Sequence, residues 1–189
     1  MDRSLEKFNR LVDALQALPT IGKKSATRLA YFMIMNDTYA GVKIAHAIED
    51  AIGSLKRCSH CGGMSEDELC YICSDETRDS TVLCIVENAK DILLLEENGL
   101  FEGKYFVLES LEELSIIHLE DIVKNGVEEI LFALTPSVAN DGVMLYIEDK
   151  LSHYNINFSK IAQGVPTGVS LENIDLLSLS RALEDRVRV

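Results

Sequence analysis

Residues 58–73 of the chain read CSHCGGMSEDELCYIC and hold four of its five cysteines. These cysteines form two Cys-x-x-Cys pairs, Cys58/Cys61 and Cys70/Cys73, with eight residues between the pairs. Two such pairs can supply four thiolates to one ion, and Zn²⁺ favours a tetrahedral site of soft sulfur ligands. Because a four-thiolate site has no open coordination position, the spacing predicts a structural zinc.

Other interpretations of this segment are weaker. The composition points to a cytosolic protein, in which disulfides are rare, so metal binding is favoured over two bridges or four unrelated thiols. His60 could replace one cysteine as a ligand, although a solvent-facing imidazole is the simpler interpretation. Gly62 and Gly63 allow a tight turn after the first pair. Cys84 stands in an apolar run and is most simply a small core residue.

The cysteine segment separates two hydrophobic patterns. Before it, apolar residues recur every three or four positions, which predicts helices at 4–18, from 23 to about 32, and at 42–52. After it, short apolar strands at 82–86, 105–108, 130–134 and 158–162 alternate with helices at 89–98, 111–124 and 142–152. Alternation of this kind predicts an α/β fold with a parallel sheet covered on both faces, and the stretch 171–183 predicts a helical tail.

We therefore expect four parts: a helical unit at 1–57, the four-cysteine motif and linker at 58–80, an α/β domain at 81–168 and a C-terminal tail at 169–189. The formal net charge of −13 is unevenly distributed over them. The first 57 residues hold nine Lys and Arg against six Asp and Glu, whereas the rest of the chain is strongly acidic. An anion-binding surface is expected only in the helical unit.

Membrane insertion is not expected. The apolar runs, such as 82–86, fall far short of the ~20 residues that a spanning helix needs. The N-terminal stretch MDRSLEKFNR has no apolar segment of the secretory type. We expect a cytoplasmic protein.

The segment 18–30, LPTIGKKSATRLA, predicts a helix–hairpin–helix. Pro19 ends the first helix and Gly22 precedes the second, whose exposed N–H groups would form a phosphate site. Lys23, Lys24 and Arg28 add positive charge there, with Lys24 and Arg28 one helical turn apart. Such contacts bind DNA phosphates and do not distinguish one base from another. The alternative is a plain helical connector with solvated lysines.

Glu87 directly follows the strand 82–86, at the sheet edge where open α/β folds place functional groups. It resembles the first signature of the Toprim domain, whose catalytic members end a later strand in Asp-x-Asp and bind Mg²⁺. Here the strand 130–134 runs into Thr135-Pro136-Ser137, and Asp141 stands alone beyond it. We therefore expect a Toprim-like scaffold without catalytic residues. A capping or surface role for Glu87 remains the alternative to metal binding, and the missing acid pair argues against Mg²⁺.

In this order, the hairpin, the four-cysteine motif, the Toprim-like domain and the late GVPTG segment at 164–168 resemble the bacterial recombination mediator family RecR over essentially the whole chain. The resemblance implies DNA-binding residues at Lys24 and Arg28 and a Toprim glutamate at Glu87. It also implies zinc ligands at Cys58, Cys61, Cys70 and Cys73. Two positions depart from the family: Lys23 replaces a usual proline, and Thr20 replaces a glycine, which predicts a tighter or strained turn.

The resemblance further implies a function. Family members are non-enzymatic mediators of recombinational DNA repair that form dimers or ring-like tetramers able to encircle DNA. They act with RecO and RecF to load recombinase at gapped DNA. Two alternatives stay open at this point: a Toprim-type, Mg²⁺-dependent phosphoryl-transfer enzyme, and an adaptor that binds only proteins.

Overall fold

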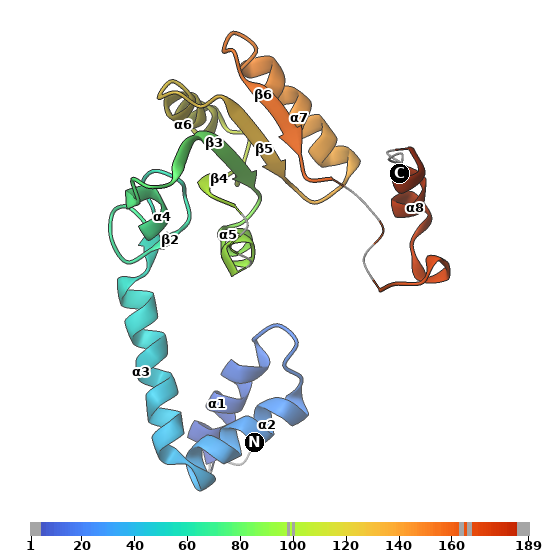
Figure 1. Cartoon of the computed structure of the whole chain (residues 1–189). Coiled ribbons are helices and arrows are strands. Elements are labelled where there is room, and N and C mark those ends of the chain that lie inside the picture. Colours follow the sequence, from blue (N-terminus) through green and yellow to red (C-terminus); the bar gives the residue numbers. More distant parts are fainter. Residues whose placement is uncertain (1–4, 98, 100, 163–164, 166–167, 185–189) are drawn as a thin grey trace. The chain divides into compact units, whose positions relative to one another are not determined.

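The computed structural model describes residues 5–97, 99, 101–162, 165 and 168–184 (Figure 1). The chain divides into two compact units, Met1–Leu55 and Lys56–Val189. The first unit is helical and the second contains the cysteines and the parallel sheet. The α/β fold class and the order of its parts are therefore confirmed.

The helical unit contains α1 (Glu6–Gln16), α2 (Lys23–Tyr31), the π-helical turn η2 (Phe32–Asn36) and α3 (Thr38–Ser54). Its small core joins α1 to α2: Val12 is buried against Ala26 and Ala30. Alanine side chains let the two helix backbones approach closely, and partly buried Ile21 packs against the same cluster. The three helices predicted from periodicity are present. The π-helical turn was not predicted, because no sequence signal distinguishes it from α-helix.

The turn between α1 and α2 is strained at Thr20. The N–H of Ile21 donates to the carbonyl of Leu18 at 3.3 Å, so residues 18–21 form a β-turn. Pro19 occupies the position where proline favours a type II turn, and such turns need positive φ at the next residue. Thr20 has φ 68° there, a region that is costly for a β-branched side chain. The strain predicted from the missing glycine is confirmed.

The second unit is built on a four-stranded sheet of order β4-β3-β5-β6, in which every pair is parallel. The strands are β3 (Asp79–Val86), β4 (Gly103–Val107), β5 (Glu129–Ala133) and β6 (Asn157–Lys160). The helices α5 (Ala89–Glu97), α6 (Glu113–Val123) and α7 (Val138–Lys150) alternate with them. α7 begins four residues before the predicted start at 142, because Ser137 caps it by accepting from the N–H of Asn140 at 3.1 Å.

The two faces of this sheet are covered by different material. Leu83 and Ile85 face one core, together with buried residues of α6 and α7. Cys84 and Val86 face a second core, formed with Ile92 of α5 and the cysteine segment. The alternation along β3 explains why the run 82–86 is apolar throughout, as expected of a strand buried on both faces. Both faces are covered, as predicted, but the second is covered largely by the cysteine segment.

The remaining described elements are short. The cysteine segment contains the antiparallel pair β1 (Lys56–Arg57) and β2 (Met64–Ser65) and the single helical turn α4 (Tyr71–Ser74). The tail contains the 3₁₀ turn η3 (Leu171–Asn173) and the helix α8 (Leu176–Glu184). Most of the GVPTG segment lies outside the described residues. Within the described ranges, no helix combines the length and apolar character needed to cross a bilayer.

The Thr20→Gly substitution should stabilise the helical unit. Glycine adopts positive φ without strain, which outweighs the entropy it adds to the unfolded chain, so the free energy of unfolding should rise by up to about 1 kcal/mol. Urea unfolding followed by circular dichroism measures this. Thr27→Gly, within α2, is the matched control and should lower stability by about 0.4 kcal/mol. A loss of stability in both variants would contradict the strain.

Candidate functional site

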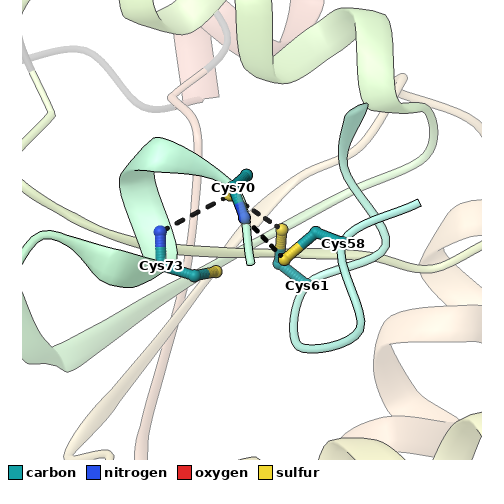
Figure 2. Close-up of side chains that lie close together, drawn as sticks. All are labelled: Cys58, Cys61, Cys70 and Cys73. Atoms are coloured by element: carbon teal, nitrogen blue, oxygen red, sulfur yellow. Dashed lines mark hydrogen bonds between the residues drawn. The ribbon is translucent and has the colours of Figure 1, made fainter. Parts of the chain in front are cut away.

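The four predicted zinc ligands converge. The sulfur atoms of Cys58, Cys61, Cys70 and Cys73 all lie within 4.8 Å of one another (Figure 2). The Sγ atoms of Cys61 and Cys70 are 3.6 Å apart, close to the ~3.8 Å edge of a tetrahedron with Zn–S bonds of about 2.3 Å. None of the five cysteines forms a disulfide, and His60 is not part of the cluster. The donor set fits a closed, tetrahedral zinc site.

The backbone around the cluster is shaped for sulfur ligands. The N–H groups of Gly63 and Cys70 donate to the sulfurs of Cys61 and Cys58, both at 3.3 Å. Gly62 has φ +75°, which lets the chain reverse after the first pair. A Cβ at Gly63 would lie 3.2 Å from the Cys61 sulfur, so this position needs a glycine for close approach. The predicted role of the two glycines is confirmed.

Hydrogen bonds between the thiols shift their pKa values in opposite directions. A hydrogen bond from the Cys73 thiol lowers the pKa of Cys61 to about 5, and the same bond raises the pKa of Cys73. By contrast, burial alone raises the pKa of Cys84 to about 12. Cys84 is 1% exposed in the second core, so the prediction of an inert core thiol is confirmed. Zinc binding by the cluster releases protons, and its affinity therefore falls at low pH.

Hydrogen bonds from Lys104, in β4, join the second cysteine pair to the sheet. Its half-buried ammonium donates to the carbonyl oxygens of Ile72 at 2.7 Å, Cys73 at 3.3 Å and Asp75 at 2.6 Å. On the same strand, the N–H of Val107 donates to the carbonyl of Cys61 at 2.8 Å. β4 is an edge strand of the sheet, so the zinc segment provides a hydrogen-bond acceptor for a backbone group of β4 that no neighbouring strand pairs.

A second polar network lies around the start of β4. Arg78 donates to the carbonyls of Phe101 and Gly103 and forms an ion pair with Glu96 of α5. The hydroxyl of buried Tyr105 donates to the same glutamate at 2.7 Å, and desolvation raises the pKa of that tyrosine. Sequence reasoning missed Lys104 and Arg78 because an isolated lysine or arginine carries no signal of the carbonyls it will meet.

Two of the three basic residues of the hairpin, Lys23 and Lys24, begin α2, and Arg28 lies in its last turn. Lys23, Lys24 and Arg28 are all exposed, and none forms an ion pair with a described residue. Gly22 occupies the N-cap in extended conformation and provides no side chain to bond the free N–H groups of the first turn. The geometry therefore offers both the N–H groups and the positive charge that a phosphate needs.

Glu87 lies directly after β3, as predicted, and lines a cavity that Glu109 also borders, while Glu109 forms an ion pair with Arg57. Among the described residues, the cysteines are the only cluster of three or more groups able to hold a metal. The carboxylate of Glu87 instead accepts from Thr135, whose hydroxyl is 2.7 Å away, and from the amide of Asn140. The bond from Thr135 is the main cause that lowers the pKa of Glu87.

Replacement of Lys104 by Met should weaken zinc binding. The change leaves three carbonyl acceptors beside the second cysteine pair without their donor, so zinc affinity should fall about ten- to a hundredfold. Competition with a chromophoric zinc chelator measures the affinity. Lys124→Met is the matched control, because Lys124 pairs only with exposed Asp121 at 3.1 Å. Equal zinc affinity in both variants would show that Lys104 does not support the site.

Comparison with known proteins agrees with this geometry. Three RecR family models match the chain: the helix-hairpin-helix at residues 8–52, the four-cysteine zinc finger domain at 55–75 and the C-terminal model at 164–187. The chain is 57% identical to "Recombination protein RecR" of a Nitratiruptor species, with both chains covered completely. It is 51% identical to the protein of that name from Campylobacter jejuni subsp. jejuni serotype O:6, again over both complete chains.

A third relative, "Recombination protein RecR" of Helicobacter pylori (strain Shi470), is 49% identical over 98% of this chain and 96% of its own. The helix-hairpin-helix, the zinc-finger match and the converging cysteines all agree with these relatives. The zinc is structural, as predicted, and is held by the four cysteines. The chain belongs to the RecR family of recombination proteins and has a role in recombinational DNA repair.

Proposed function

We propose that the chain is a non-enzymatic mediator that binds double-stranded or gapped DNA without sequence preference. It acts with RecO and RecF to load recombinase at gaps. The observation that carries the proposal is the exposed charge of Lys23 and Lys24 at the uncapped N-terminus of α2 and of Arg28 farther along the helix, none of which forms an ion pair with a described residue. These groups contact backbone phosphates, so the affinity is modest and depends strongly on salt.

The proposal assigns a role to each part of the chain. The helical unit, residues 1–57, contacts DNA, and the zinc segment at 58–80 supports the sheet. The Toprim-like domain at 81–168 is acidic and serves protein partners rather than nucleic acid. No group of described acids around Glu87 could hold a metal pair, which disfavours phosphoryl transfer as the function.

We also propose that the protein works as a homo-oligomer, a dimer or a tetrameric ring. The exposed apolar side chains of α3 support this: the helix has seventeen residues, and none of them is buried. Val42, Ile44, Ile48 and Ile52 are each at least 48% exposed. Such a surface is costly in water, and a second copy of the chain presents a matching one. Several weak basic sites around one duplex would then act together.

Replacement of Lys24 and Arg28 by Ala should weaken DNA binding. Loss of two phosphate contacts reduces the slope of log affinity against log salt by about two. Fluorescence anisotropy with duplex and gapped DNA at several salt concentrations measures both quantities. The control is the Lys124→Ala/Lys150→Ala variant, which removes the same charge from exposed positions of the second unit. An equal slope in the Lys24/Arg28 variant would overturn the assignment.

The Ile48→Asp substitution should reduce the oligomer mass. A carboxylate placed in an apolar contact between copies must be desolvated, which opposes association. Multi-angle light scattering of the zinc-loaded protein measures the mass. Leu114→Asp is the control, because Leu114 of α6 is even more exposed, at 78% against 55% for Ile48. A mass that stays unchanged, or a monomeric parent protein, would contradict the assignment of α3 as the contact.

A further inference from the structure

The carboxylate of Glu87 is fully engaged within the chain. The hydroxyl of Thr135 donates to one oxygen, Oε2, at 2.7 Å. The side-chain amide of Asn140 donates to the other oxygen, Oε1. The backbone N–H of Thr135 also points to the carboxylate and contributes to the lowered pKa of Glu87. Neutral donors therefore bond to both oxygens of the glutamate, and the positive charge of Lys90 also helps to lower its pKa.

The orientation of the Asn140 amide follows from its surroundings. Its nitrogen, Nδ2, also donates to the carbonyl oxygen of Thr135 at 2.7 Å. A carboxylate and a carbonyl can only accept, so the side-chain oxygen of Asn140 could bond to neither of them. The backbone N–H of Asn140 donates in turn to Ser137, the N-cap of α7. The amide hydrogens of Asn140 are thus directed at Glu87.

These contacts join the two central strands of the sheet at one edge. Glu87 follows β3, Thr135 follows the neighbouring β5, and Asn140 lies in the first turn of α7. In the order β4-β3-β5-β6, the connections after β3 and β5 leave the sheet in different directions, which makes this edge the topological switch point. α/β proteins bind ligands at such points, and the Toprim enzymes place their cation-binding acids at their sheet edge.

The contacts compete with a cation for Glu87, because each carboxylate oxygen already accepts a hydrogen bond. Hydroxyl and amide hydrogens directed at the carboxylate would repel a metal ion that tried to share it. Asp141, the first acid after Thr135 along the chain, lines a different cavity together with Phe132 and Lys160. Glu109 lines the same cavity as Glu87, and its carboxylate forms an ion pair with Arg57. Divalent cations at such sites require several carboxylates or other oxygens around one point.

We propose that Glu87 is a positioning residue that holds the connection between β5 and α7 against the end of β3, with Thr135 and Asn140 as donors in place of a metal ion. The three residues form what we term the Glu87 latch. The latch also shapes a cavity of about 300 Å³ at the same edge, which is lined by Glu87 and Asn140 together with Leu108, Leu134 and Val143. Partners that use this edge therefore depend on Glu87 through the position of the connection.

Two variants of Thr135 test the latch. Thr135→Val keeps the shape of the side chain and removes the hydroxyl donor, whereas Thr135→Ser keeps the donor. Hydrogen exchange read by mass spectrometry should show the amides of residues 134–141 exchanging about tenfold faster in Thr135→Val and in Glu87→Gln. Thr135→Ser should match the parent protein. Equal exchange in Thr135→Val and Thr135→Ser would overturn the latch.

A gain of cation binding provides a second, independent test. The Thr135→Asp/Asn140→Asp variant replaces both donors with carboxylates beside Glu87 and should bind Mn²⁺, measured by electron paramagnetic resonance of the zinc-loaded protein. The parent protein should bind none at this edge. Mn²⁺ binding by the parent that Glu87→Gln abolishes would overturn the proposal, as would a double variant that folds and still binds no Mn²⁺.

The latch lies outside the hairpin, so its tests and those of the proposed function fail separately. Thr135→Val should bind DNA as the parent does, because Lys24 and Arg28 belong to the other compact unit. If DNA binding fails to depend on Lys24 and Arg28, the proposed function is wrong and the latch is unaffected. If hydrogen exchange does not depend on the Thr135 hydroxyl, the latch is wrong and the proposed function is unaffected.

Discussion

The second face of the parallel sheet has too little helix to cover it, and the zinc segment supplies the missing cover. Cys58, Cys61 and Cys70 are buried in the same core as Val86 and Tyr105. Four cysteine sulfurs within 4.8 Å of one another form a donor set for a zinc ion, which would take up the charge of their thiolates. Because these sulfurs are also core residues, the metal and the sheet stabilise each other, and loss of zinc would expose a face of β3 and β4. Three hydrogen bonds from Lys104 join the zinc segment to β4 at the edge of the sheet.

The two compact units of the chain differ in their charge. Positive charge that is free to meet phosphate lies on the small helical unit, where the uncapped start of α2 adds N–H donors. The larger unit is acidic, and two of its cations are engaged within it: Lys104 binds carbonyls and Arg78 pairs with Glu96. A net charge of −13 is therefore compatible with DNA binding. The charge of the surface that faces the phosphates, and not the net charge of the chain, decides whether DNA can bind.

The sheet edge shows how a glutamate that resembles a Toprim signature finds its partners within the chain. A glutamate at the end of β3 is typical of metal-dependent members of the fold. In this chain, threonine and asparagine donors satisfy that glutamate. A carboxylate that is half-buried needs partners, and hydrogen-bond donors meet that need as well as a cation does. Retention of the acid therefore says little about retention of a metal.

Much of this protein follows from local sequence alone. The period of apolar residues predicted the helices and the parallel strands, and the spacing of the cysteines predicted the zinc, because each depends on a few neighbouring residues. The strain at Thr20 was predicted only through the resemblance to a family that has glycine at this position. Only the tertiary structure decided which groups meet across long separations. Lys104 reaches carbonyls about thirty residues away, and Glu87 meets Asn140 across fifty-three. No periodicity or spacing encodes such pairs, because they arise from strand order and from the need of buried polar groups to find partners.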